Sequence, residues 1–265
     1  MAIDSEVTLT VHGLAVDNGN VRAEVFLEKL RAILGALKIA DRFLNEKKSH
    51  DYLIVGLETA SAHATLRERV SVRKTIPAST VRCVRDVVES VYNGDRNINR
   101  FPVDLVEALR PLVRDVGRTF SHGEVRFSGD NVIRIDDFLA LQADKALRRA
   151  KGEGGPPERH FEGIAIETLD GIVKEMDARG TLVRGKLVLT AGGKEIDCVF
   201  RHSDIEMLRT SFDRRARVEA VAHYDGVSLL PVRLDVKRIT LLQEGGGLDR
   251  WRGALDKKQN GGGLD

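Results

Sequence analysis

The chain has 265 residues, of which 42% are hydrophobic, and this is enough to form one large core or two modest ones. Its 42 Lys and Arg residues nearly balance its 40 Asp and Glu residues, which excludes a histone-like or polybasic binder. No apolar run approaches the roughly 18 residues of a membrane span, and no signal-peptide pattern opens the sequence, so we expect a cytoplasmic protein.

Residues 1–150 mix strand and helix periodicities. Apolar and polar residues alternate over Glu6–His12, which predicts a half-buried strand. Apolar residues then recur near a period of 3.6 from Val21 to Asn45, which predicts an amphipathic helix with Asn18 or Asn20 as its N-cap.

The rest of this part is predicted to hold a hairpin, two helices that follow prolines, a short strand and a last helix. Their expected ranges are 52–58 and 63–70 for the hairpin, Pro77 to about Tyr92, Pro102 to about Val116, Glu124–Phe127, and Asp136–Ala150. Pro111 should kink or split the second of the two helices. Strands and helices do not alternate regularly, so the pattern predicts an α+β domain.

A Gly- and Pro-rich segment at 151–160 is predicted to be a linker, because glycine frees the backbone and proline blocks regular hydrogen bonding. Residues 161–244 follow with three strands, a short helix and two more strands. Ser203 and Glu206 have the spacing of a capping box at the start of that helix. The strands are expected at Gly171–Asp177, Leu182–Thr190, Glu195–Arg201, Arg217–Tyr224 and Val232–Leu242.

This order, with its helix between the third and fourth strands, resembles a five-stranded OB-like β-barrel. The whole chain is similar to a group of uncharacterised bacterial proteins that pair a helix-rich α+β half with a small barrel. The segments that carry this resemblance are GIVKEMDARG, EIDCVFR and VEAVAHYDG. The resemblance implies this two-part architecture and no particular activity.

Local motifs for catalysis, cofactors or metals are missing. The pair nearest to a metal-ligand spacing is His202 and Glu206, but the capping box would turn His202 away from Glu206. Cys83 and Cys198 both fall on apolar faces and are expected in the core. We therefore predict no cofactor, no metal and no enzymatic role, although an enzyme whose site is assembled from scattered residues stays open.

Basic residues on the barrel offer a nucleic-acid surface, since OB-like barrels often bind single strands. Interleaved acidic residues could instead pair with them across strands. The candidate phosphate contacts, with one candidate stacking residue, are Arg214, Arg215, Arg217, Lys237, Arg238 and Tyr224.

The end of the chain, residues 245–265, is predicted to be a flexible Gly-rich tail in which GGGLD occurs twice. An expression-vector origin of this repeat stays open. Leu248, Trp251 and Leu255 form a candidate protein contact within the tail, because tryptophan is enriched at interface hot spots. The favoured hypothesis is a non-enzymatic binding protein that contacts a protein partner or a second copy of itself. The alternative is single-stranded nucleic-acid binding by the barrel.

Overall fold

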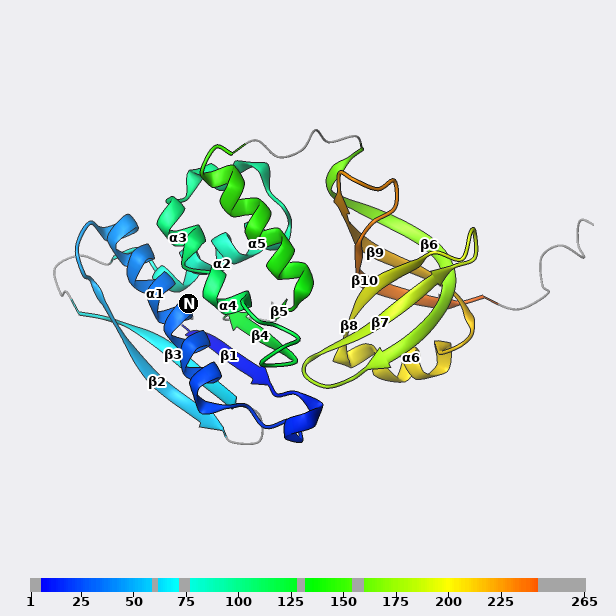
Figure 1. Cartoon of the computed structure of the whole chain (residues 1–265), viewed down its shortest axis with the longest axis horizontal. Coiled ribbons are helices and arrows are strands. Elements are labelled where there is room, and N and C mark those ends of the chain that lie inside the picture. Colours follow the sequence, from blue (N-terminus) through cyan, green and yellow to red (C-terminus); the bar gives the residue numbers. More distant parts are fainter. Residues whose placement is uncertain (1–5, 59–61, 72–76, 128–131, 154–159, 243–265) are drawn as a thin grey trace, which may run out of the picture.

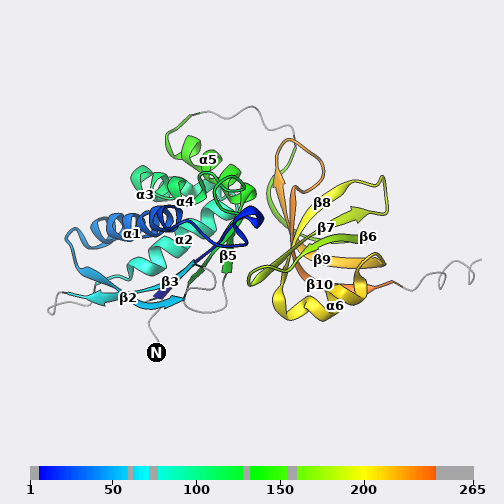
Figure 2. The same cartoon turned by 60° about the horizontal axis from the view of Figure 1, so that its bottom comes forward.

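The computed structural model describes residues 6–58, 62–71, 77–127, 132–153 and 160–242. It has two parts, which lie side by side in Figures 1 and 2. The first is an α+β domain and the second is a closed five-stranded barrel. The predicted fold class is confirmed. The tail residues Leu248, Trp251 and Leu255 lie outside the described residues, as does most of the predicted linker.

The sheet of the first domain has the order β2-β3-β1-β4-β5, and its described pairings are all antiparallel. Its strands are β1 (Glu6–His12), β2 (His50–Glu58), β3 (Ala62–Val70), β4 (His122–Phe127) and β5 (Val132–Ile135). Strand β5 was not predicted. Its four residues, VIRI, are too few to display a two-residue period.

Helices cover one face of this sheet, as Figure 2 shows. They are α1 (Ala23–Asn45), α2 (Thr80–Tyr92), α3 (Val103–Glu107), α4 (Arg110–Val113) and α5 (Asp137–Ala150). The predicted interruption at Pro111 is confirmed, because α3 ends at Glu107 and Pro111 lies in the first turn of α4. The predicted N-cap of α1 is wrong, since Arg22 occupies that position without a side-chain hydrogen bond.

The two faces of β1 explain the layering. Val7, Leu9 and Val11 are buried in the core beneath the helices. Thr8, Thr10 and His12 alternate with them and therefore lie on the opposite, polar face of the sheet. That second face is the one that carries the candidate site.

The barrel has the ring order β10-β8-β7-β6-β9, with β8 and β10 parallel. Its strands are β6 (Glu162–Asp177), β7 (Leu182–Leu189), β8 (Glu195–Arg201), β9 (Arg215–Asp225) and β10 (Arg233–Leu241). Helix α6 (Ile205–Ser211) lies between the third and fourth of them, which is the OB arrangement. Cys198 is buried in the barrel core and Cys83 in the domain core, as predicted.

Two details of the barrel differ from the prediction. Strand β6 begins at Glu162 rather than Gly171, because the residues before Gly171 also pair with β9. Ile164 and Ile166 in this first half of the strand remain exposed. The capping box does not form. Ser203 lies in a 3-10 turn before α6, and its hydroxyl contacts Asp204, so Asp204 is the residue that precedes the helix. None of the described helices is long and apolar enough to cross a bilayer.

Candidate functional site: the seam between the two domains

Most of the arginines predicted to contact nucleic acid are engaged within the barrel. Arg217 Nε lies 2.9 Å from Asp170 Oδ1, and Arg215 lies 4.0 Å from the same carboxylate. Arg238 is 3.9 Å from Glu219 on the neighbouring strand. The hydrogen bond from Arg217 lowers the pKa of Asp170. Cross-strand pairing therefore accounts for much of this charge.

The other predicted contacts do not join the arginines. Arg214 bonds back to the carbonyl of Thr210 at 3.4 Å. The Tyr224 hydroxyl donates to Glu167 at 3.2 Å. Tyr224 lies seven positions after Arg217 on β9, about 23 Å at a strand rise of about 3.3 Å per residue. Lys237 faces the groove between the domains. The six residues therefore do not form one surface.

A charged network is buried where the domains meet. Arg233 on β10 donates through Nη1 to both carboxylate oxygens of Asp136, at 3.0 and 2.9 Å. Asp136 also caps α5 by accepting from the backbone N–H of Leu139. Close by, Asp235 accepts from the Tyr92 hydroxyl at 2.8 Å and lies 2.9 Å from His223 Nε2. These contacts join α2 and α5 to the barrel.

Burial and neighbouring charges set the protonation of this network. Burial raises the pKa of Tyr92 well above its usual value, so the phenol stays neutral and donates. Burial opposes ionisation of Asp235, but hydrogen bonding to His223 and the charge of Arg233 outweigh it and lower the pKa of that carboxyl. The result is a carboxylate–guanidinium network that ties the domains together.

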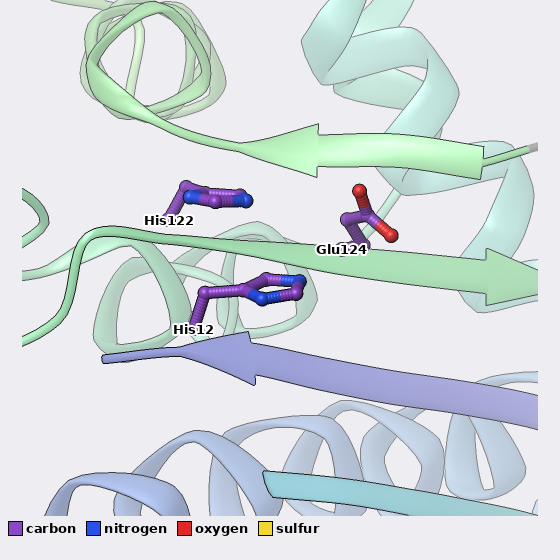
Figure 3. A group of neighbouring side chains, drawn as sticks. All are labelled: His12, His122 and Glu124. Atoms are coloured by element: carbon purple, nitrogen blue, oxygen red, sulfur yellow. The ribbon is translucent and has the colours of Figure 1, made fainter. Parts of the chain in front are cut away.

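A second part of the seam lies where the β6–β7 loop meets β4. Glu124 Oε1 accepts from the backbone N–H groups of Thr181, at 2.7 Å, and Leu182, at 3.1 Å. His122 Nε2 donates to the carbonyl of Arg179 at 3.1 Å. His12 stacks on His122 with ring centroids 4.3 Å apart. Figure 3 shows both imidazoles beside Glu124.

These three side chains could hold a metal ion, because one ligand atom from each lies within 4.8 Å of the other two. Burial lowers the pKa of His122 to about 3, helped by the nearby charge of Arg134. Burial also lowers the pKa of His12. Both imidazoles are therefore neutral at pH 7, and neutral imidazole is the form that binds metals.

A groove at the seam has a volume of about 640 Å³. It runs between β5 on one side and β7, β8 and β10 on the other, with an apolar lining that includes Ile133 and Leu182. Arg201, His202 and Lys237 add polar groups to it. Among the described residues, Arg201 and Lys237 have no ion-pair partner, unlike the predicted Arg215, Arg217 and Arg238.

A further surface lies far from the seam, on β2. This strand forms one edge of the sheet and, within the described part of the chain, pairs with β3 alone. Leu53, Ile54, Val55 and Leu57 are 39–65% exposed. The opposite edge, β5, adjoins the barrel, where Arg134 donates to the carbonyl of Leu182 at 3.0 Å. One edge of the sheet is thus covered and the other presents apolar side chains.

The His12–His122–Glu124 cluster was not predicted from the sequence. His122 and Glu124 are two residues apart, a spacing that places both on one face of a strand. His12 joins them because β1 pairs with β4 in the register that sets His12 opposite His122. The His122-Gly123-Glu124 triplet was the available signal, but the strand was predicted to begin at Glu124.

The chain matches no protein-family model. No curated protein matches it either. Among solved structures, a ZRD-deleted mutant of TiaS in complex with agmatine is 11% identical with a TM-score of 0.22, and covers 93% of this chain and 55% of that chain. A tRNA fluorescent labeling enzyme is 10% identical with a TM-score of 0.22, and covers 92% and 45%. This chain thus spans about half the length of each, and likenesses this weak carry no argument about its fold or function.

Proposed function

We propose that the chain is a binding protein that associates with a second copy of itself through strand β2. The observation that supports this proposal is the exposed edge strand with its apolar residues Leu53, Ile54, Val55 and Leu57. A long apolar edge offers unpaired backbone groups together with a surface that gains free energy by leaving water. Natural proteins usually cover or charge such an edge.

The sequence of β2 favours its own copy as the occupant. Antiparallel pairing across Val55, where β2 has a register shift against β3, sets Leu53 opposite Leu57 of the other copy. A two-fold interface of this kind uses the same patch on both chains. Asp51 lies outside the apolar segment and is already paired with Lys48 at 2.8 Å, so no like charges oppose each other within that segment.

Sedimentation equilibrium over a range of protein concentrations tests this association. We expect a monomer–dimer equilibrium in the wild type and a monomer in Leu57→Lys, because lysine at an edge strand opposes pairing. Leu229→Lys is the matched control, since Leu229 is exposed on the barrel loop after β9 and should leave the dimer intact. A wild-type chain that is monomeric at every concentration, or a dimer that survives Leu57→Lys, would contradict the proposal.

A second candidate function is the binding of single-stranded nucleic acid in the groove at the seam. It is supported by the position of this groove on β7 and β8 and by the unpaired cations Arg201 and Lys237. OB barrels use the face of their second and third strands for oligonucleotides. The groove favours those two residues as the phosphate contacts, in place of the arginines that already have acidic partners.

Fluorescence anisotropy with a labelled single-stranded oligonucleotide tests this candidate. Binding should weaken as salt rises, because phosphate contacts release counterions. The double variant Arg201→Ala/Lys237→Ala should weaken it strongly, whereas Arg215→Ala/Arg217→Ala should have little effect. If Arg215→Ala/Arg217→Ala weakened binding more than Arg201→Ala/Lys237→Ala, the arginines of β9 would be the phosphate contacts instead. An absence of binding at low salt would reject the nucleic-acid hypothesis.

A further inference from the structure

The donors of the seam cluster come from two paired strands. His12 ends β1 and His122 begins β4, and the two residues face each other in the antiparallel register. Glu124 follows two residues later on the same face of β4. The two imidazoles and the carboxylate therefore lie close to one another, as Figure 3 shows.

One atom of this cluster has no hydrogen-bond partner in the part of the chain that the structure describes. His12 Nε2 is buried, and no hydrogen-bond partner for it lies among the described residues. A buried polar atom left without a partner costs about 1–3 kcal/mol, so such an atom requires an explanation. Bound to an ion, this nitrogen would no longer be unsatisfied.

Gly180 keeps the space between the donors open. A Cβ atom at this position would lie 2.5 Å from Glu124 Oε1 and 3.2 Å from Nε2 of both His12 and His122. The same glycine has φ of +97°, a conformation that other residues rarely adopt. Three candidate ligand atoms thus lie around the position that a Cβ atom at residue 180 would take, so any larger residue there would crowd them.

We propose that His12, His122 and Glu124 bind a divalent cation of the zinc type. Two imidazoles and one carboxylate form a ligand set that suits zinc and leaves a coordination position for water or another ligand. A cavity of about 230 Å³ adjoins the cluster and is lined by His12, Glu124 and Arg126 among others. The ion draws the imidazoles inward, because a zinc–nitrogen bond is only about 2.0–2.1 Å long.

The neighbours of His122 suit this role. Its Nδ1 lies 3.2 Å from the hydroxyl of Ser121, which can accept a hydrogen bond when the proton moves from Nε2 to Nδ1. A metal-bound histidine ordinarily donates its other N–H to such a partner. The change ends the bond from Nε2 to the Arg179 carbonyl, so ion binding alters the contact between β4 and the β6–β7 loop.

Calorimetric titration of the full, tag-free chain with Zn²⁺, after chelation and desalting, tests the proposal. We expect one ion per chain. His12→Ala and His122→Ala should each weaken Zn²⁺ binding by at least about 10–100-fold, the range reported even for residues that only support a ligand. His63→Ala is the matched control, because His63 lies on the same sheet face and bonds to Thr10 but is not part of the cluster. Its affinity should equal that of the wild type.

Glu124→Gln keeps the test decisive if a histidine variant fails to fold. Glutamine retains an acceptor for the Thr181 and Leu182 amides while it removes the charged ligand, so binding should weaken in a folded protein. X-ray absorption at the zinc edge should show two imidazoles on the bound ion. A wild type that binds no ion, unchanged affinity in the cluster variants, or a zinc spectrum without imidazole would each overturn the proposal.

Discussion

Charged side chains are usually exposed and apolar ones buried, but the seam between the domains and the edge strand β2 each break one half of this rule. The seam buries charged groups, including Arg134, Asp136 and Arg233. Strand β2 exposes apolar ones. At the seam the charges find partners within the chain, whereas β2 has an uncovered outer edge in the described part of the molecule. The charged side chains of the seam are thus ion-paired within the chain, whereas the apolar side chains of β2 are left for a partner.

The largest effect should come from breaking a buried pair of the seam. Asp136→Ala removes the two hydrogen bonds from buried Arg233, leaves it, among the described residues, only the longer ion pair with Asp235 at 3.7 Å and removes the cap of α5, and we expect a loss of about 3–5 kcal/mol in unfolding free energy. Asp170→Ala, which breaks the exposed pair with Arg217, should cost no more than about 1 kcal/mol. Urea denaturation at pH 7 measures both, and equal losses would show that the seam is not held by this pair.

Gly180→Ala tests the space at the metal-binding end of the seam. Backbone strain should cost about 1–3 kcal/mol, and the new Cβ would also collide with Glu124. Gly192→Ala is the control for strain alone, because Gly192 also has positive φ, at +83°, but no atom lies within 4 Å of its added Cβ. Thermal unfolding should rank Gly180→Ala as the less stable variant. Zn²⁺ affinity should fall in Gly180→Ala and not in Gly192→Ala.

Acid should weaken the seam before most carboxylates titrate. Burial lowers the pKa of His122 to about 3, far below the value near 6.5 of an unfolded chain. At pH 5 the unfolded chain therefore binds a proton that the folded chain does not, so stability is full above pH 6.5 and falls as the pH drops. The expected loss is about 1.4 kcal/mol per pH unit for this proton.

Urea denaturation in chelator at pH 7, 6 and 5 measures this slope. The buried His12, whose pKa is also lowered, should add to it. His122→Gln should reduce the slope by removing one of the two titrating groups. The same slope in His122→Gln and the wild type would mean that the pKa of His122 is not lowered in the folded seam.

The smallest effect on the single chain should come from the β2 edge. Leu57 is exposed, so Leu57→Lys should change the unfolding free energy of the monomer by no more than about 0.5 kcal/mol. The wild-type melting temperature should nevertheless rise with protein concentration, because association stabilises the folded state. The variant should lose this dependence. A wild-type melting temperature that does not depend on protein concentration would show that β2 does not bind a second copy of the chain.

The local sequence determined much of the architecture. The two-residue period of the barrel strands, the 3.6-residue period of α1 and the break at Pro111 predicted those elements, because each depends on neighbours in the chain. The interleaved acidic residues also allowed cross-strand ion pairs as an alternative to phosphate contacts, and several of the predicted arginines form them.

Only the tertiary structure decided which distant residues meet. His12 joins His122 and Glu124 through the pairing of β1 with β4, and Gly180 reaches them from the barrel loop. The exposure of Leu57 likewise depends on β2 being at the edge of the sheet. Local periodicity predicts which face of a strand is apolar, but it does not predict which other strand pairs with that strand. The physical reason is that strand pairing and domain docking are long-range contacts, whose free energy appears only when both partners are folded.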